Sequence, residues 1–319
     1  MKTVTVLGGS GFVGSSVVAR LDQAGYQVKV LTRRREQAKH LILLPFVQVV
    51  ECDVNDHGAL RAQLTGSDVV INLIGILHQT SDNGFEKMHH QLPRRVAQLC
   101  VELGIPRLLH MSALQAAVSA PSEYLRSKAA GDEAVMECSK KLQVTIFRPS
   151  VIFGARDRFI NLFAKLIQYI PVLALAMPQA KFQPIWVEDV AAAFVNAVDE
   201  PATYGRIYEL GGPAIMTLQQ VMEAVMKTTG VQRPIIGLST RLSLLQGSFM
   251  QLLPIKLLSR DNVKSMQVDN VCQQPMANEL GVVPTDMFAV ISGYLVENNP
   301  RGAYDQFRAA AGRVINARR

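Results

Sequence analysis

Cysteine is scarce and scattered in this sequence. The four cysteines, Cys52, Cys100, Cys138 and Cys272, show no CxxC spacing. That arrangement argues against a zinc site and against a disulfide framework. It favours a protein that works in a reducing compartment.

Metal-ligand patterns and membrane spans are also missing. On a helix, the adjacent His89 and His90 would point in different directions, so we expect no metal. The most apolar stretch, Phe159 to Pro178, is a poor membrane span because polar residues and a proline interrupt it. One lysine precedes the apolar run TVTVLGG at the start of the chain, which leaves no room for a signal or transit peptide. We therefore expect a cytoplasmic location.

Charge is modest and unevenly placed. Charged residues make up 18% of the chain, and 33 Lys and Arg against 26 Asp and Glu give a net charge of +7. Five Arg against one Asp in Pro300 to Arg319 supply +4 of that total. This positive balance favours binding to anionic small molecules or to an acidic surface, and we expect no nucleic-acid binding. Hydrophobic residues make up 49%, enough for a sizeable core.

The first half of the chain alternates strand and helix patterns. Several expected strands are apolar throughout, as strands buried on both faces are. The expected strands are Thr3–Leu7, Gln27–Thr32, Val47–Cys52, Val69–Ile74, Leu108–Met111 and Val144–Phe147. The expected helices are Phe12–Gln23, Gly58–Leu64, Leu92–Leu103 and Ser122–Lys140. This order predicts an α/β fold with a doubly wound parallel Rossmann sheet.

The alternation stops after Pro149, and the length of 319 residues suggests about two domains. We expect residues 1–150 to form the Rossmann domain and residues 151–319 to form a smaller C-terminal substrate lobe. Within the second part, Trp186–Val198 is typical of a helix and Arg206–Leu210 of a strand. Residues 183–211 should therefore return to the Rossmann core.

A glycine-rich turn joins the first expected strand to the first expected helix. Gly8 permits a tight turn, Gly11 lets the backbone approach a pyrophosphate, and Gly14 allows the helix to pack close to the strand. The helix start offers N–H groups and partial positive charge to the phosphates. The alternative is a glycine turn without a ligand. The predicted NAD(P)-binding turn comprises Gly8, Gly9, Ser10, Gly11, Phe12, Val13 and Gly14.

The end of the second strand favours NADP(H) over NAD(H). An NAD-binding unit would have Asp or Glu here, whereas this chain has Thr32, Arg33 and Arg34. A guanidinium binds a 2′-phosphate bidentately, so NADP(H) is preferred and NAD(H) remains possible. The alternative is that the arginines begin a solvated helix. Further predicted cofactor contacts are Asp53 and Val54 at the adenine, and Asn72, Leu73, Ile74 and Gly75 at the ribose and nicotinamide.

A proton-transfer pair is predicted on the fourth helix. Tyr124 and Lys128 are four residues apart, so their side chains share one helix face. A cation beside the phenol should lower the pKa of Tyr124 and suit it to acid–base catalysis, and Lys128 should also hold the nicotinamide ribose. Ser112 ends the fifth strand, where its hydroxyl would bind a substrate carbonyl. The alternative is a surface pair with no catalytic role.

At this point the chain resembles the short-chain dehydrogenase/reductase superfamily, of the extended or atypical kind that includes NAD-dependent epimerases and dehydratases. The resemblance covers nearly all of residues 1–230 and rests on the glycine turn, on Tyr124 with Lys128, and on Arg148–Gly154. It implies that Pro149, Ser150 and Val151 pack beside the nicotinamide. The separation of 12 residues between Ser112 and Tyr124 is shorter than in sugar-nucleotide epimerases, which weakens the assignment of Ser112.

Other segments are similar to the dehydrogenase-like accessory subunit of respiratory complex I and its bacterial relatives. They are Tyr124–Lys128, Asp157–Asn161 and Gln183–Val190. This resemblance implies NADPH binding with a structural rather than a catalytic role. Two hypotheses follow. One is an oxidoreductase that moves a hydride between NADPH and an unidentified carbonyl or alcohol, and the other is a non-catalytic NADPH-binding module of a respiratory or quinone-related membrane complex.

Two C-terminal segments bear on location. An amphipathic helix is predicted over residues 239–253, because large apolar residues recur there at spacings of three and four. It either closes the substrate lobe or presents a face to a membrane surface or a partner. The tail over residues 300–319 is a docking helix, a solvated tail or a contact for acidic lipid. A protein peripheral to the inner membrane is thus possible. The spaced residues are Leu238, Leu242, Leu245, Phe249 and Leu252.

Overall fold

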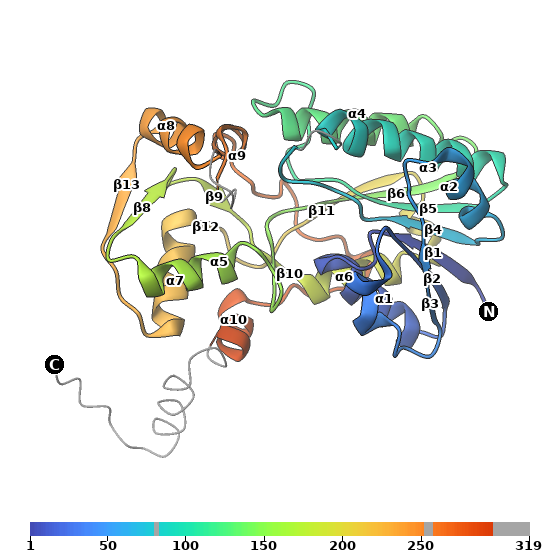
Figure 1. Cartoon of the computed structure of the whole chain (residues 1–319), viewed down its shortest axis with the longest axis horizontal. Helices are drawn as coiled ribbons and strands as arrows, with labels where there is room; N and C mark the ends of the chain where they lie inside the picture. Colours follow the sequence, from blue (N-terminus) through green and yellow to red (C-terminus); the bar gives the residue numbers. More distant parts are fainter. Residues whose placement is uncertain (80–82, 252–257, 296–319) are drawn as a thin grey trace, which may run out of the picture.

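The computed structural model describes residues 1–79, 83–251 and 258–295 and is built around one parallel sheet of seven strands (Figure 1). The strands are β1 (Thr3–Leu7), β2 (Gln27–Thr32), β3 (Val47–Glu51), β4 (Val69–Asn72), β5 (Arg107–Met111), β6 (Gln143–Pro149) and β11 (Arg206–Leu210). They lie in the order β11-β6-β5-β4-β1-β2-β3. The order reverses between β1 and β4, which is where ligands bind in doubly wound sheets.

Helices cover both faces of the sheet (Figure 1). On one face lie α1 (Phe12–Gln23) and α6 (Val187–Asn196), which pack together. On the other lie α2 (His57–Leu64), α3 (Leu92–Glu102) and α4 (Glu123–Met136). An apolar cluster covers each face of the sheet. Val4 and Val6 belong to one cluster and Leu7 to the other, and all three are inaccessible to solvent. The predicted doubly wound α/β fold is confirmed.

Several expected elements end earlier in the structure, among them one helix and one strand beside the predicted site. Helix α4 ends at Met136 instead of Lys140, and a turn follows in which Lys141 N–H donates to the Cys138 carbonyl at 2.9 Å. Strand β4 ends at Asn72 instead of Ile74, because the Asn72 side chain accepts a hydrogen bond from the Ile74 N–H at 3.2 Å and turns the chain.

The chain leaves the sheet after β6 and returns with α6 and β11. The returning segment begins with β10 (Ile185–Trp186), which pairs in parallel with β7 (Ile152–Phe153). The intervening and following segments form the second lobe, at the left of Figure 1. Its further elements are α5 (Ile160–Tyr169), β8 (Leu173–Ala176), β9 (Lys181–Phe182), β12 (Met216–Thr217), α7 (Leu218–Thr229), β13 (Ile235–Leu238), α8 (Thr240–Met250), α9 (Arg260–Ser265) and α10 (Met287–Leu295).

The second lobe has its own apolar core. Buried side chains of α5 and α7 meet those of α10 and β8, including Ile167, Val221 and Ile291. Strand β8 pairs with β13 in parallel, and β9 pairs with β12 antiparallel. Among the described residues, no helix is long and apolar enough to cross a membrane.

Helix α8 lies within the range predicted from the sequence, but its large apolar side chains point outward. Leu245 and Phe249 are exposed, whereas Ser243 and Gly247 are buried. Of the two alternatives, the exposure of these side chains favours a face presented to solvent over an apolar face packed into the lobe. Leu252 and the predicted tail over residues 300–319 lie outside the described residues.

Candidate functional site

The glycine turn has the geometry that the sequence predicts. Gly8 has a φ of +81°, which favours glycine, and the Gly11 N–H donates to its carbonyl at 3.0 Å. A Cβ placed on Gly14 would lie 2.2 Å from that same carbonyl oxygen. A Cβ on Gly8 would lie 3.1 Å from the Leu73 carbonyl carbon. The turn therefore sits against the carboxyl end of β4, at the reversal of strand order.

The start of α1 is suited to a phosphate group. Gly11 is its N-cap and offers no side-chain hydrogen bond, and the first turn carries no acidic residue. A Cβ on Gly11 would meet only the Gly8 carbonyl, at 3.2 Å, so this side of the turn leaves room for a ligand to approach the backbone. The arrangement fits the pyrophosphate of a dinucleotide.

Thr32 connects the arginine segment to the glycine turn. Its buried hydroxyl donates to the Arg34 carbonyl at 3.1 Å and lies 3.4 Å from the Ser10 hydroxyl. The side chains of Arg33 and Arg34 are exposed. Arg33 also helps to lower the pKa of Asp53, after the larger effect of the backbone hydrogen bond from Asn55. The two arginines are thus available beside the predicted adenosine region.

The remaining predicted adenine and ribose residues divide into exposed and buried groups. The side chains of Val54 and Leu73 pack in the core, so only their backbone atoms could contact the predicted cofactor. One carboxylate oxygen of Asp53 accepts from the N–H and the side-chain amide of Asn55, both at 3.0 Å. Gly75 is exposed, and Ile74 is half-buried.

Lys128 lies at the end of β4. A Cβ on Gly75 would lie 3.1 Å from Lys128 Nζ, which itself donates to the Met111 carbonyl at 3.2 Å. Only 2% of Lys128 is exposed, and burial lowers its pKa to about 8 while nearby Asp132 acts in the opposite direction. The structure therefore brings Lys128 to the edge where the cofactor is predicted.

The second lobe fixes the first turn of α4. Ser122 caps this helix through the Leu125 N–H at 3.2 Å. The carboxylate of Asp261, on α9, accepts from the N–H groups of Glu123 at 2.8 Å and Tyr124 at 3.0 Å. This contact between lobes holds the first turn of α4, which carries Tyr124.

The pKa of Tyr124 differs from the expectation. We expected Lys128 to lower it, but burial raises the pKa of Tyr124 to about 12. The ring lies in an aromatic group, 5.3 Å from the His89 ring and 5.8 Å from the Phe85 ring, both edge-on. Tyr124 is therefore a neutral phenol near pH 7.

His89 supports this aromatic group from a π-helix at Glu86–Gln91. The Ile76 N–H donates to His89 Nε2 at 3.0 Å, and burial lowers the pKa of His89 to about 2. The neutral ring therefore carries its proton on Nδ1 and donates to Ser127 Oγ at 2.9 Å. A Cβ on Gly131 would lie 1.9 Å from the His89 carbonyl oxygen, so α4 approaches the π-helix closely.

Ser112 belongs to a buried polar cluster behind Lys128. Asn72 donates to His110 Nδ1 at 3.3 Å, and His110 Nε2 faces an Asp132 oxygen at 3.9 Å. The other Asp132 oxygen accepts from Arg148 at 2.8 Å. Among the described residues, His110 Nε2 is buried without a hydrogen-bond partner, and Ser112 Oγ and one Asp132 oxygen make no well-formed hydrogen bond, although Ser112 lies close enough to help lower the pKa of Asp132 against the larger, opposite effect of burial. The cluster therefore offers hydrogen-bonding atoms at the end of β5 that the described part of the chain does not fully use.

The segment Pro149–Val151 has a structural role in this arrangement. Ser150 is 5% exposed, and its hydroxyl lies 2.6 Å from the Asn270 side-chain oxygen and accepts from the Gln183 N–H at 3.1 Å. Pro149 ends β6, and Val151 is half-buried. Ser150 therefore connects the sheet to the second lobe, and its contact with the nicotinamide stays a prediction.

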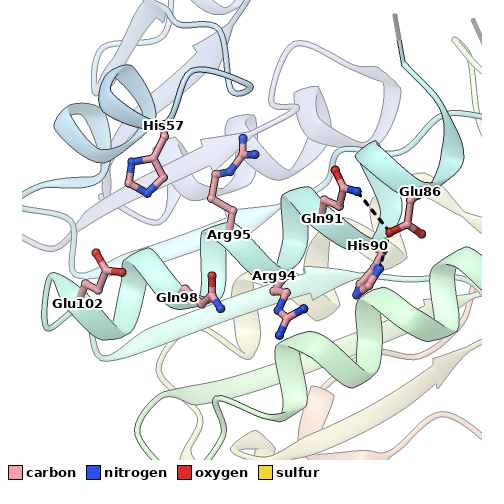
Figure 2. A pocket seen from close by; sticks show the side chains of 8 residues that line it. All are labelled: His57, Glu86, His90, Gln91, Arg94, Arg95, Gln98 and Glu102. Atoms are coloured by element: carbon pink, nitrogen blue, oxygen red, sulfur yellow. Dashed lines mark hydrogen bonds and ion pairs between the residues drawn. The ribbon is translucent and has the colours of Figure 1, made fainter. Parts of the chain in front are cut away.

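A groove of about 410 Å³ lies along α3, with His57 at one side (Figure 2). It is polar, and Glu86 within it bonds His90 at 2.8 Å. None of the predicted cofactor or catalytic residues line it. Among the described residues, no group of three or more histidine, cysteine or acidic side chains is placed to hold a metal.

The chain is similar to known proteins over most of its length. The model of the NAD dependent epimerase/dehydratase family matches residues 4–211. NADH dehydrogenase [ubiquinone] 1 alpha subcomplex subunit 9, mitochondrial, of Arabidopsis thaliana is 38% identical over 69% of this chain and 56% of its own length. A ceramide reductase of Caulobacter vibrioides is 31% identical over 60% of this chain and 59% of its own. The matched region thus spans little more than half of each relative.

Solved structures share the fold. The dTDP-glucose 4,6-dehydratase DesIV from Streptomyces venezuelae, with NAD bound, superposes with a TM-score of 0.73 at 20% identity, over 95% of this chain and 99% of its own. At that identity the likeness concerns the fold alone.

Proposed function

The chain belongs to the NAD-dependent epimerase/dehydratase family, and we propose from this membership that it is an oxidoreductase that moves a hydride between NADPH and a carbonyl or alcohol substrate. The observation that carries the proposal is the placement of Lys128 Nζ at Gly75, with Tyr124 one turn earlier on the same helix. The glycine turn, Gly75 and Lys128 would hold the cofactor.

NADPH is the preferred cofactor in this proposal. Arg33 and Arg34 are exposed and follow directly after β2, where an acidic residue would repel a 2′-phosphate. Thr32 holds the backbone of Arg34 through its hydroxyl, which keeps this segment beside the glycine turn. When bound, the nicotinamide supplies or accepts the hydride.

The protein groups perform the proton transfer. Tyr124 is a neutral phenol near pH 7, so it donates its proton to the oxygen of a carbonyl that is being reduced. Lys128, with a pKa of about 8, is mostly charged at pH 7 and would hold the nicotinamide ribose, since burial and not Lys128 sets the pKa of Tyr124. Ser112 Oγ is buried beside Asp132 without a well-formed hydrogen bond and would orient the substrate oxygen.

The test is NADPH oxidation by the purified full-length chain with a panel of aldehydes and ketones. Tyr124→Phe should lower turnover at least about 100-fold, because it removes the acid, and should leave NADPH affinity nearly unchanged. Tyr169→Phe is the matched control, since Tyr169 is 84% exposed on the second lobe. Equal loss in both variants, or undiminished turnover in Tyr124→Phe, would contradict the proposal.

A second candidate is a non-catalytic NADPH-binding module that assembles with a respiratory or quinone-related membrane complex. The name of the Arabidopsis relative, a subunit of NADH dehydrogenase, favours it, whereas the ceramide reductase favours the first. This candidate predicts tight NADPH binding with no oxidation on any substrate of the panel. It also predicts a location at the periphery of the inner membrane.

A further inference from the structure

Helix α8 presents large apolar side chains to solvent. Leu242 is 52% exposed, Leu245 66% and Phe249 69%. They are three and four residues apart and so lie along one face of the helix. Ile236, on the adjoining strand β13, is 56% exposed. Figure 1 shows α8 and β13 at the same edge of the second lobe.

The opposite face of α8 explains this orientation. Ser243 is inaccessible to solvent, accepts from the Met177 N–H at 3.1 Å and donates to the Ser239 carbonyl at 2.9 Å. A Cβ on Gly247 would lie 3.0 Å from the Arg260 nitrogen at the start of α9. Small residues are required where α8 meets its neighbours, so the large ones point outward.

The charged residues in the sequence around α8 indicate which kind of binding partner suits this face. From Arg233 to Arg260 the sequence contains no Asp or Glu. Arg241 on α8 and Arg260 at the start of α9 are both exposed. The first carboxylate after this stretch, that of Asp261, is engaged by the N–H groups of Glu123 and Tyr124. An apolar face with basic neighbours matches an anionic bilayer surface.

We propose that the α8 face, defined as Ile236, Leu242, Leu245 and Phe249, docks this protein reversibly onto membranes that contain anionic phospholipid. The apolar side chains enter the boundary between headgroups and acyl chains, while Arg241 and Arg260 pair with lipid phosphates. The proposal goes beyond the oxidoreductase function and does not depend on it, because it rests on a surface of the second lobe.

Vesicle flotation with the full-length chain tests the docking. The probes are vesicles of phosphatidylcholine alone and of phosphatidylcholine with phosphatidylglycerol, at low and high salt. We expect flotation with the anionic vesicles, a several-fold smaller floating fraction at high salt, and little flotation with phosphatidylcholine alone. Absence of flotation with anionic vesicles at low salt would overturn the proposal.

Matched variants assign the binding to α8. Leu245→Gln with Phe249→Gln should lower the floating fraction at least about tenfold, because two apolar side chains leave the lipid phase. Leu43→Gln is the control, since Leu43 is 87% exposed on the Rossmann domain. Undiminished flotation of the double variant would refute the assignment to α8.

Two further measurements distinguish lipid docking from misfolding and from self-association. Circular dichroism and urea denaturation of the same variants show whether they fold, and both should match the parent chain. A failure of carbonyl reduction leaves the flotation result standing, so the two proposals fail separately. If the parent chain forms a concentration-dependent dimer that the double variant loses, and no flotation is seen, then the face binds a second copy and the lipid proposal is wrong.

Discussion

Replacing Lys128 by methionine should stabilise this protein at neutral pH. Burial lowers the pKa of Lys128 from 10.5 to about 8, and because 2% of the residue is exposed, solvent screening offsets little of the cost. That difference corresponds to about 3 kcal/mol against folding at pH 7. Methionine removes the charge but loses the hydrogen bond to the Met111 carbonyl, worth about 1 kcal/mol. The net gain is about 2 kcal/mol.

The gain should depend on pH in a defined direction. Below pH 8 the lysine is charged in both the folded and the unfolded chain, so the full cost of burial is present. As the pH rises from about 8 toward 10.5, the folded state loses its proton first and the cost disappears. The stability difference between Lys128→Met and the parent chain should therefore shrink to zero or reverse by about pH 10.

Urea denaturation at pH 7 and pH 10 measures both quantities. Lys141→Met is the control, because Lys141 is exposed and its replacement should change the free energy of unfolding by less than about 0.5 kcal/mol. A Lys128→Met variant that is less stable than the parent at pH 7, or whose stability difference is the same at both pH values, would refute this account of the buried lysine.

Other predictions concern the close packing of α4 and the charge beside Lys128 on that helix. Gly131→Ala should destabilise the protein by about 1–3 kcal/mol in urea denaturation, because its Cβ would lie 1.9 Å from the His89 carbonyl. Gly293→Ala, with no atom of the described residues within 4 Å of the new Cβ, should be neutral or slightly stabilising. Equal effects of the two substitutions would contradict the packing argument. Asp132→Asn should lower the pKa of Lys128 further, because the carboxylate of Asp132 raises it. The pH dependence of stability should then move to lower pH. An unchanged profile would show that Asp132 does not act on Lys128.

The local features of the site were predictable from the sequence. The glycine turn depends on residues within a single strand–turn–helix segment, and a spacing of four places Tyr124 and Lys128 on one helix face wherever the helix lies. The same spacing of four continues to Asp132, so the sequence could also have predicted that Asp132 lies beside Lys128. Alternating strand and helix patterns are typical of a parallel sheet, which is why the doubly wound fold was expected correctly.

The missed features depend on contacts between distant segments. His89 bonds Ser127 across 38 residues, and His110 bonds Asn72 across 38 residues, so neither role shows in a local pattern. The pKa of Tyr124 depends on how deeply α4 is covered. The outward face of α8 follows from the close contact at Gly247, which periodicity does not reveal, because a stripe of apolar residues has the same spacing inside or outside a lobe.

Cofactor binding is the most direct test of the central claim. Titration calorimetry of the full-length chain with NADPH and with NADH should show saturable binding of both at one site, with NADPH the tighter. Arg33→Ala with Arg34→Ala should weaken NADPH binding by about 1–3 kcal/mol and leave NADH nearly unchanged, because only the 2′-phosphate contacts are lost. Absence of binding by either dinucleotide, or equal affinities in the parent chain, would contradict an NADPH-binding site at the glycine turn.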